Sequence, residues 1–298
     1  MFGQLSANTL SPPPIIDRAG DLMEKYDAIF CDVWGVVHDG VNAHFGAQDA
    51  LRRFRERGGT VVLVSNAPVP KAQVARMLAL KGFPEDAWDD IVSSGDIALR
   101  HISKAGYRRV YAIGPQDRDS ALFNAVSAEF GPLETSEAIV CTGLNDDLSE
   151  VAEDYDPLLT VALERKLPFV CANPDKYVDV GGKLYLCAGA IADRYAELGG
   201  SVFWAGKPHA SAYGTALDIA EDLRKEMLHR SRILAIGDAV RTDLKAAATA
   251  GVDALFIGGG IHRTDVMDGD EMCPRGLATL FAAPDASPAV GAMPQLIW

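Results

Sequence analysis

Short apolar runs recur along the chain, and each ends in small or polar residues. We expect buried strands over eight of these runs, at residues 28–31, 60–64, 110–113, 138–141, 168–172, 201–204, 232–236 and 253–257. Amphipathic stretches separate them and predict helices, among them 47–56, 71–80, 211–228 and 242–250. Continuous apolar strands that alternate with helices predict an α/β protein whose mostly parallel sheets are covered on both faces.

Ligands of such sheets bind beyond the carboxyl ends of the strands, so polar residues at those positions are the first candidates for function. Asp32 interrupts the first apolar run and is followed by Gly35, which allows a sharp turn. Ser65 and Asn66 follow the second run and stand at the entrance of a helix, where their donors can face an anion. Each residue alone has an ordinary explanation as a turn or helix cap.

Two further elements carry charge at strand ends. Lys207 follows the run at 201–204 and precedes a proline, which prevents the strand from continuing. Asp238 and Asp243 follow the run at 232–236 and bracket a loop that enters a helix. Such clustered carboxylates suit Mg²⁺, which binds few protein carboxylates and keeps several waters. We expect all four elements to converge along one sheet edge.

These four motifs, in this order, resemble those of the haloacid dehalogenase superfamily. The spacing and the form Gly-Asp-x-x-x-Thr-Asp at residues 237–243 are similar to subclass IIA, the NagD-like sugar and nucleotide phosphatases. The resemblance implies a Rossmann-like, doubly wound parallel-sheet core with an inserted α/β cap domain. We expect the core domain at residues 1–95 and 201–298 and the cap domain at 96–200.

The resemblance further implies a Mg²⁺-dependent phosphatase in which Asp32 attacks phosphorus and forms a phospho-aspartyl intermediate. The Mg²⁺ site would consist of Asp32, Asp238, Asp243 and the backbone carbonyl of Trp34, with Asp243 orienting Lys207 or a metal-bound water. Lys207 would also act in catalysis by stabilising the transferring phosphoryl group. The phosphoryl oxygens would be bound by Ser65, the amide of Asn66 and Lys207.

Trp34 is a departure from the family pattern, in which this position is an aspartate that serves as general acid and base. Losing a general acid costs about 10² to 10⁴ in rate. We therefore expect slow turnover, a leaving group that needs no proton, or another acid, with His38, Asp39 and a cap residue as candidates. Two alternatives stay open: a phosphometabolite-binding or regulatory protein with impaired catalysis, and a dehalogenase or phosphonatase-like hydrolase.

The candidate for substrate selection is the segment Asn173-Pro174-Asp175, which resembles the Asn-Pro-Asp turn of subclass IIA caps. We expect it to close over the leaving group, although a tight turn without a ligand explains each residue equally well. The glycines at 258–260 lack the spacing of a dinucleotide-binding loop.

Composition narrows the partners. The 298 residues contain 41 Asp and Glu against 28 Lys and Arg, a net charge of −13, which disfavours nucleic acid. No apolar run approaches the roughly 18 residues of a membrane span. We expect a small phosphorylated metabolite as the partner, bound where a cation and a lysine reverse the local field. A homodimer stays open.

The chain opening and the cysteines bear on location. The segment through Tyr26 contains the prolines 12–14, and we expect an arm lying over the domain. Its first 25 residues lack a basic start followed by an apolar stretch. The five cysteines are odd in number and scattered, which predicts buried free thiols. Together these features favour the cytoplasm.

Overall fold

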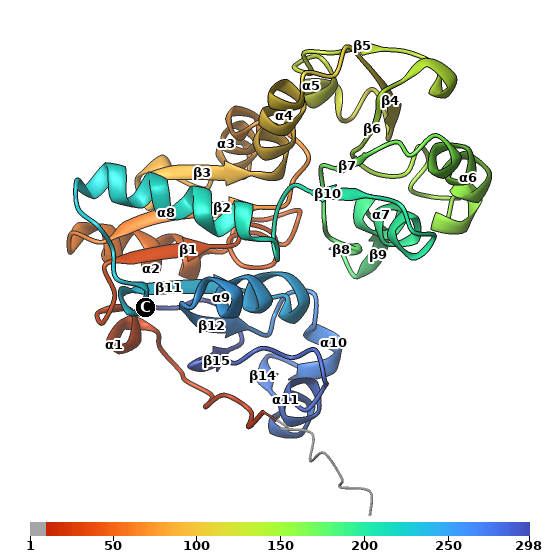
Figure 1. Ribbon diagram of the computed structural model, residues 1–298. Helices are drawn as coiled ribbons and strands as arrows, with labels where there is room; N and C mark the ends of the chain where they lie inside the picture. Colours follow the sequence, from red (N-terminus) through yellow and green to blue (C-terminus); the bar gives the residue numbers. More distant parts are fainter. Residues whose placement is uncertain (1–9) are drawn as a thin grey trace, which may run out of the picture.

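The computed structural model describes residues 10–298, and it contains two parallel sheets (Figure 1). The first sheet has the strand order β15-β12-β11-β1-β2-β3. Its strands are β1 (Ala28–Cys31), β2 (Thr60–Ser65), β3 (Asp90–Ser93), β11 (Ile233–Gly237), β12 (Asp253–Ile257) and β15 (Gly291–Met293). All neighbours in it are parallel, as the continuous apolar runs predict.

The second sheet is built from one continuous stretch of chain, and we call residues 109–204 the inserted unit. Its strand order is β10-β7-β6-β4-β5, again with parallel neighbours. The strands are β4 (Arg109–Ile113), β5 (Glu129–Phe130), β6 (Ala138–Cys141), β7 (Phe169–Cys171) and β10 (Val202–Trp204). β10 lies beyond the expected boundary at residue 200, yet it pairs with β7.

Alternate residues of the first sheet enter two different cores, which explains why its strands are apolar throughout. Phe30 and Val62 face one cluster, whereas Ile29 and Val61 face the other. The first cluster includes residues of α4 (Ser94–Ala105), α8 (Ala210–Arg224) and α9 (Lys245–Ala250). The second includes residues of α2 (Phe45–Glu56) and α3 (Lys71–Leu80).

The two sheets share packing through α4. The first cluster continues from Ile97 and Ile102 of this helix to Val140 and Val170 on one face of the second sheet. The other face of that sheet forms a third cluster with α6 (Asp156–Glu164) and α7 (Ala188–Glu197). The units are therefore joined by buried apolar contacts as well as by the chain.

The remaining elements are short. Two antiparallel hairpins are present, β8 (Tyr177–Val180) with β9 (Lys183–Leu186), and β13 (Met267–Asp268) with β14 (Glu271–Met272). The short helices are α1 (Gly20–Met23), α5 (Ser120–Phe123), α10 (Arg263–Val266) and α11 (Pro274–Phe281). None of the helices in residues 10–298 has the length and apolarity to cross a membrane.

Within residues 10–26, the opening arm lies along the first sheet, as expected. The Ile16 N–H donates to the Ala292 carbonyl, and the Ala292 N–H donates to the Pro14 carbonyl, both at 2.9 Å. Residues 1–9 of the expected arm lie outside the described residues. All five cysteines are free thiols, as predicted, and four of them are buried, whereas Cys273 is partly exposed.

Candidate active site

Three of the candidate residues lie at the carboxyl edge of the first sheet. Asp32 directly follows β1, Asp238 directly follows β11, and Ser65 is the last residue of β2. These three strands are adjacent and parallel, so their carboxyl ends meet at one edge. All three side chains belong to residues that are less than a tenth exposed.

Lys207 reaches the same place from the second sheet. The prediction that it follows a strand of the same sheet edge was wrong, because Val202–Trp204 pairs in register with Phe169–Cys171 of the inserted unit. From β10 the chain returns through Gly206 to a cis peptide bond between Lys207 and Pro208. A Cβ at Gly206 would lie 2.4 Å from Asn66 Oδ1, so only glycine fits this return.

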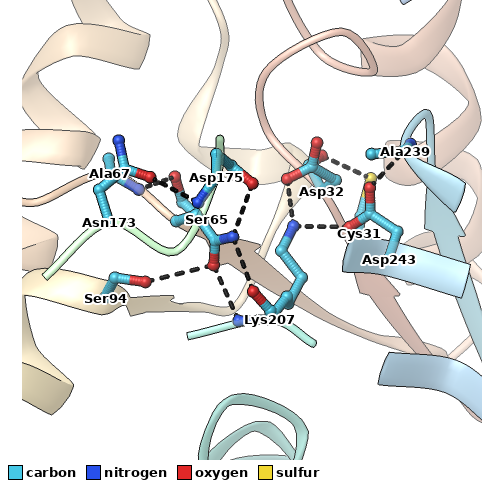
Figure 2. A network of polar contacts seen from close by, with 11 residues as sticks. Cys31, Asp32, Ser65, Ala67, Ser94, Asn173, Asp175, Lys207, Ala239 and Asp243 are labelled. Atoms are coloured by element: carbon cyan, nitrogen blue, oxygen red, sulfur yellow. Dashed lines mark hydrogen bonds and ion pairs between the residues drawn. The ribbon is translucent and has the colours of Figure 1, made fainter. Parts of the chain in front are cut away.

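Lys207 joins two carboxylates (Figure 2). Its Nζ donates to Asp32 Oδ1, and to Asp243 Oδ1 at 2.7 Å. Lys207 is only 2% exposed and Asp243 only 1%. Asp243 lies in a π-helical turn, Val240–Leu244, that begins just after Asp238. The backbone of Gly237 approaches Asp243 so closely that a Cβ there would lie 2.2 Å from the Asp243 Cβ.

The buried charges shift one another. Burial raises the pKa of Asp32 to about 7, and the negative charge of Asp243 adds to this rise, although Lys207 opposes it. Burial also raises the pKa of Asp238 well above its usual range, again with added repulsion from Asp32 and Asp243. Burial lowers the pKa of Lys207, but Asp243 and Asp32 outweigh it and the net shift is upward. One lysine does not neutralise three carboxylates.

A divalent cation would fit this excess of negative charge. Asp32, Asp238 and Asp243 each offer a carboxylate oxygen, and these oxygens lie within 4.8 Å of one another. Both oxygens of Asp243 are engaged, by Lys207 and by the Ala239 N–H at 3.1 Å. Asp32 and Asp238 each keep one oxygen without a hydrogen-bond donor among residues 10–298. These two are therefore the direct ligand candidates, and Asp243 positions Lys207.

Asp238 is enclosed by backbone. A Cβ at Gly35, whose φ is +82°, would lie 2.0 Å from Asp238 Oδ2, and one at Gly260 would lie 1.9 Å from the same atom. The Ile261 N–H donates to this oxygen at 2.7 Å. Sequence reasoning missed the role of Gly260 and Ile261, because it tested the glycines only for a dinucleotide loop. Their position directly after an apolar strand of the first sheet was the available signal.

Asn66 connects the two units. Its Oδ1 accepts hydrogen bonds from the Lys207 N–H at 2.9 Å and from Ser94 Oγ at 3.2 Å. Its Nδ2 donates to Asp175 Oδ1 at 2.8 Å and to the Lys207 carbonyl at 3.0 Å. Both amide hydrogens are thus used within the protein. The Asn66 amide would have to give up one of these partners to bind a phosphoryl oxygen, and that role stays a prediction, whereas Ser65 Oγ still has its proton to donate.

The segment Asn173–Asp175 turns toward the first unit. Asn173 Oδ1 accepts from the Asp175 N–H at 3.2 Å, which forms a local turn. Asn173 and Asp175 line the central cleft, whereas Pro174 is buried and a Cβ at Gly206 would lie 3.1 Å from its Cδ. The structure therefore brings Asp175 to the candidate site and gives Pro174 a packing position.

Trp34 contacts the inserted unit through its side chain. Its Nε1–H donates to the Asp179 carbonyl at 2.8 Å, so the indole is bonded to the β8–β9 hairpin. The ring also packs edge-on against His38, with centroids 4.9 Å apart. A Cβ at Gly40 would lie 2.6 Å from the indole ring. Nothing in the sequence pattern indicated the contact with Asp179.

One cleft of about 780 Å³ is lined by the candidate residues Asp32, Trp34, Ser65, Asn66, Asp175, Lys207, Asp238 and Asp243. Its floor is the polar edge of the first sheet, and the β8–β9 hairpin contributes to its wall. Apolar side chains such as Val41, Val74, Met77 and Leu186 line other parts of the cleft, together with charged groups such as Arg118. Apolar lining with a few convergent polar groups is typical of a site for a small ligand.

Two family models match the chain. One is described as haloacid dehalogenase-like hydrolase and matches residues 29–126. The other is described as HAD-hydrolase-like and matches residues 204–282. The two matches include Asp32, Ser65, Lys207 and Asp238, which are the residues gathered at the sheet edge.

Relatives match over most of the chain. The crystal structure of a hydrolase of the haloacid dehalogenase-like family from Brucella suis is 41% identical, with a TM-score of 0.83, and covers 95% of this chain and 100% of its own. The ribonucleotide monophosphatase NagD of Escherichia coli is 25% identical over 250 residues, which cover 80% of this chain and 90% of NagD. A possible sugar phosphatase from Cytophaga hutchinsonii shares the fold, with 21% identity, a TM-score of 0.66, and coverage of 82% of this chain and 88% of its own.

Proposed function

Since the chain belongs to the haloacid dehalogenase-like hydrolases, in their NagD-like phosphatase branch, we propose that it hydrolyses a small phosphomonoester with Asp32 as the nucleophile. A single observation carries this proposal. Lys207 from the inserted unit and Asp32, Asp238 and Asp243 from the first unit meet in one buried ion cluster at the floor of the cleft.

In the proposed reaction, Asp32 attacks phosphorus in line with the leaving oxygen, and a water molecule then hydrolyses the phospho-aspartyl intermediate. Lys207 and Ser65 bind the phosphoryl oxygens as negative charge develops on them. Asp243 fixes the position of Lys207 through the 2.7 Å ion pair. The inserted unit acts as the cap, and since β10 pairs with β7 we place its carboxyl boundary after Trp204.

The donor set fits Mg²⁺, because it consists of hard carboxylate oxygens whose mutual repulsion a divalent cation relieves. Asp32 and Asp238 would bind the ion directly, with the backbone carbonyl of Trp34 as a further ligand. When bound, the ion screens the repulsion between Asp32 and the phosphate and keeps Asp32 ionised. The partner is a small phosphorylated metabolite, a sugar or nucleotide phosphate among the candidates.

The test is phosphate release by the purified protein with Mg²⁺ on a panel of sugar, nucleotide and aryl phosphates. We expect release that stops in chelator and in Asp32→Asn. The matched control is Asp27→Asn, which removes a carboxylate from the opposite end of the same strand and should retain activity. Release by Asp32→Asn would contradict the proposal. Release only after Trp34→Asp would favour a phosphometabolite-binding protein with impaired catalysis.

A further inference from the structure

The proposed hydrolysis leaves one chemical requirement without a residue. When the bond from phosphorus to an alkyl oxygen breaks, that oxygen needs a proton, and a positioned acid contributes about 10² to 10⁴ in rate. Trp34 has no proton of suitable acidity, and its Nε1–H is already donated to the Asp179 carbonyl. Another side chain in the cleft must supply the proton if alkyl esters are substrates.

Four titratable groups on the floor of the cleft are unsuited to donate this proton. Lys207 Nζ donates to two carboxylates, and both oxygens of Asp243 are engaged. Asp238 accepts from the Ile261 N–H and is a proposed ligand of the cation. Burial lowers the pKa of His38 to about 4, with the charge of Lys81 adding to the effect, so its ring is neutral near pH 7. A neutral imidazole is a weak acid.

Other carboxyl groups also line the cleft, among them Asp147 and Asp179, but Asp175 is the one from the inserted unit whose charge acts on Asp32. Its Oδ1 accepts from Asn66 Nδ2, which also donates to the Lys207 carbonyl, so a fixed fork holds Asp175 beside the Lys207 backbone. No residue in 10–298 donates to its other oxygen, and the residue lines the cleft with part of its surface accessible. Figure 2 shows its carboxylate pointing toward Asp32.

The surroundings of Asp175 bring its pKa closer to neutral pH. Burial raises the pKa of Asp175 to about 6, although the charge of Lys207 and the hydrogen bond from Asn66 oppose the rise. Acids and bases work best when their pKa lies near the working pH. The other titratable groups that interact with it are Asp243, Asp32 and the thiols of Cys171 and Cys187.

The geometry of an in-line displacement also supports a role for Asp175. In an in-line displacement the leaving oxygen departs on the side of phosphorus opposite the nucleophile. Asp32 attacks from the first sheet, so the leaving group extends into the cleft toward the inserted unit. Asp175 approaches from that unit, on the turn that follows β7.

We propose that Asp175 is the general acid and base of this enzyme, an assignment that rests on the proposed function of Asp32. As the bond between phosphorus and the leaving oxygen breaks and the bond to Asp32 forms, the Asp175 carboxyl gives its proton to the leaving oxygen. Water then attacks phosphorus, the bond to Asp32 breaks, and the water proton returns to Asp175. The net reaction is ester plus water to alcohol plus phosphate.

The test compares leaving groups in Asp175→Asn, which can retain the acceptor for Asn66 Nδ2. The probes are glycerol phosphate, whose alkoxide needs a proton, and 2,4-dinitrophenyl phosphate, whose phenolate leaves without one. We expect kcat/KM to fall by about 10² to 10⁴ for the alkyl ester and to stay within about threefold for the aryl ester. Because the same residue serves the water step, the aryl ester should give a burst of phenolate followed by slow turnover.

The matched control is Asp179→Asn, a carboxylate four residues further along whose Oδ1 accepts from the Gly182 N–H at 2.7 Å. It should not change the ratio of the two kcat/KM values. An equal fall for both esters in Asp175→Asn would indicate a structural role and overturn the assignment. So would an unchanged alkyl rate, or a wild type that cleaves only the aryl ester. Asp32→Asn tests the proposed function separately, since it must abolish both reactions.

Discussion

An ion pair lies at each end of the paired strands β1 and β11, and the two ion pairs differ in burial and in the pKa of their carboxylates. At the amino ends, Arg232 Nη2 lies 2.6 Å from Asp27 Oδ1, and both side chains are partly exposed, at 46% and 32%. At the carboxyl ends, Lys207 pairs with Asp32 where almost no water reaches. The hydrogen bond from Arg232 lowers the pKa of Asp27, whereas burial raises that of Asp32 to about 7.

The difference shows what each end of the strand pair does. At the exposed end, water hydrates both ions and the hydrogen bond adds a small net stabilisation. At the buried end, the carboxylates lose more hydration than one lysine restores. The cluster around Lys207 therefore lowers the stability of the folded protein while it concentrates charge for a cation and a phosphate. The pKa shifts of Asp27 and Asp32 have opposite signs for this reason.

Removing the buried ammonium group of Lys207 should have the largest effect on stability. Lys207→Met leaves Asp32 and Asp243 buried without their partner, and we expect the free energy of unfolding to fall by about 3–5 kcal/mol. Urea denaturation in chelator at pH 7.5 measures it. The control Lys225→Met breaks an exposed ion pair with Asp222, whose side chains are 76% and 80% exposed, and should show no measurable loss. Equal losses would remove the contrast between buried and exposed charge.

The pH dependence of stability should separate the two ends next. Because the folded-state pKa of Asp32 is raised, its favourable contribution exists at low pH and is lost as pH rises from about 4 through 7. In chelator, Asp32→Asn should remove this loss and be more stable than wild type at pH 8, by about 2 kcal/mol. Denaturation midpoints across pH 4–8 test the sign. A variant less stable than wild type at pH 8 would contradict it.

A neutral contact at the buried end should have a smaller effect. Trp34→Phe keeps an aromatic side chain but removes the hydrogen bond to the Asp179 carbonyl, worth about 0.5–1.5 kcal/mol. We expect faster amide exchange over residues 177–186 and little change elsewhere. Trp88→Phe is the control, because its buried Nε1 has no hydrogen-bond partner in residues 10–298. Unchanged exchange in the hairpin would mean that the indole does not restrain it.

The exposed pair should give the smallest effect. The pKa of Asp27 is lowered, so its contribution is present above about pH 4 and is lost as pH falls below that value. Asp27→Asn should cost less than about 1 kcal/mol at pH 7 and nothing near pH 2. The cost at pH 7 should also shrink in 1 M salt, which screens exposed charges. If the stability loss of Asp27→Asn is the same in 1 M salt, the Asp27–Arg232 pair is not screened by solvent and the contrast with the buried cluster fails.

Much of the fold was predictable because buried parallel strands are apolar on both faces. The run Ala28–Cys31 is β1, and Asp253–Ile257 is β12, with the bounds that the pattern predicts. The pattern missed β3 and β15, of four and three residues, because such short segments carry little periodicity. It also missed the hairpin around Gly181 and Gly182, although two glycines between alternating residues are a known hairpin signal.

The candidate site divides in the same way. Asp32, Ser65 and Asp238 lie at the carboxyl ends of adjacent strands, so a local pattern was enough to place them at one edge. The origin of Lys207 and the engagement of Asn66 depend on how the inserted unit packs against the first unit. Asn66 and Asp175 are 109 positions apart in the sequence, and no local periodicity reports such a contact. The pattern placed Lys207 after the correct strand, the run at 201–204, but in the wrong sheet.

The strand order also sets a schedule for synthesis. Ala28 pairs with Ile233, so β1 leaves the ribosome roughly 200 residues before its neighbour β11. At about 5–20 residues per second this interval is on the order of 10 to 40 seconds. During it, β1 to β3 lack their neighbour β11, whereas the inserted unit gains all its strands, from β4 to β10, before β11 is made. We expect that unit to fold first during translation, and the nascent β1 edge to be the segment that chaperones protect.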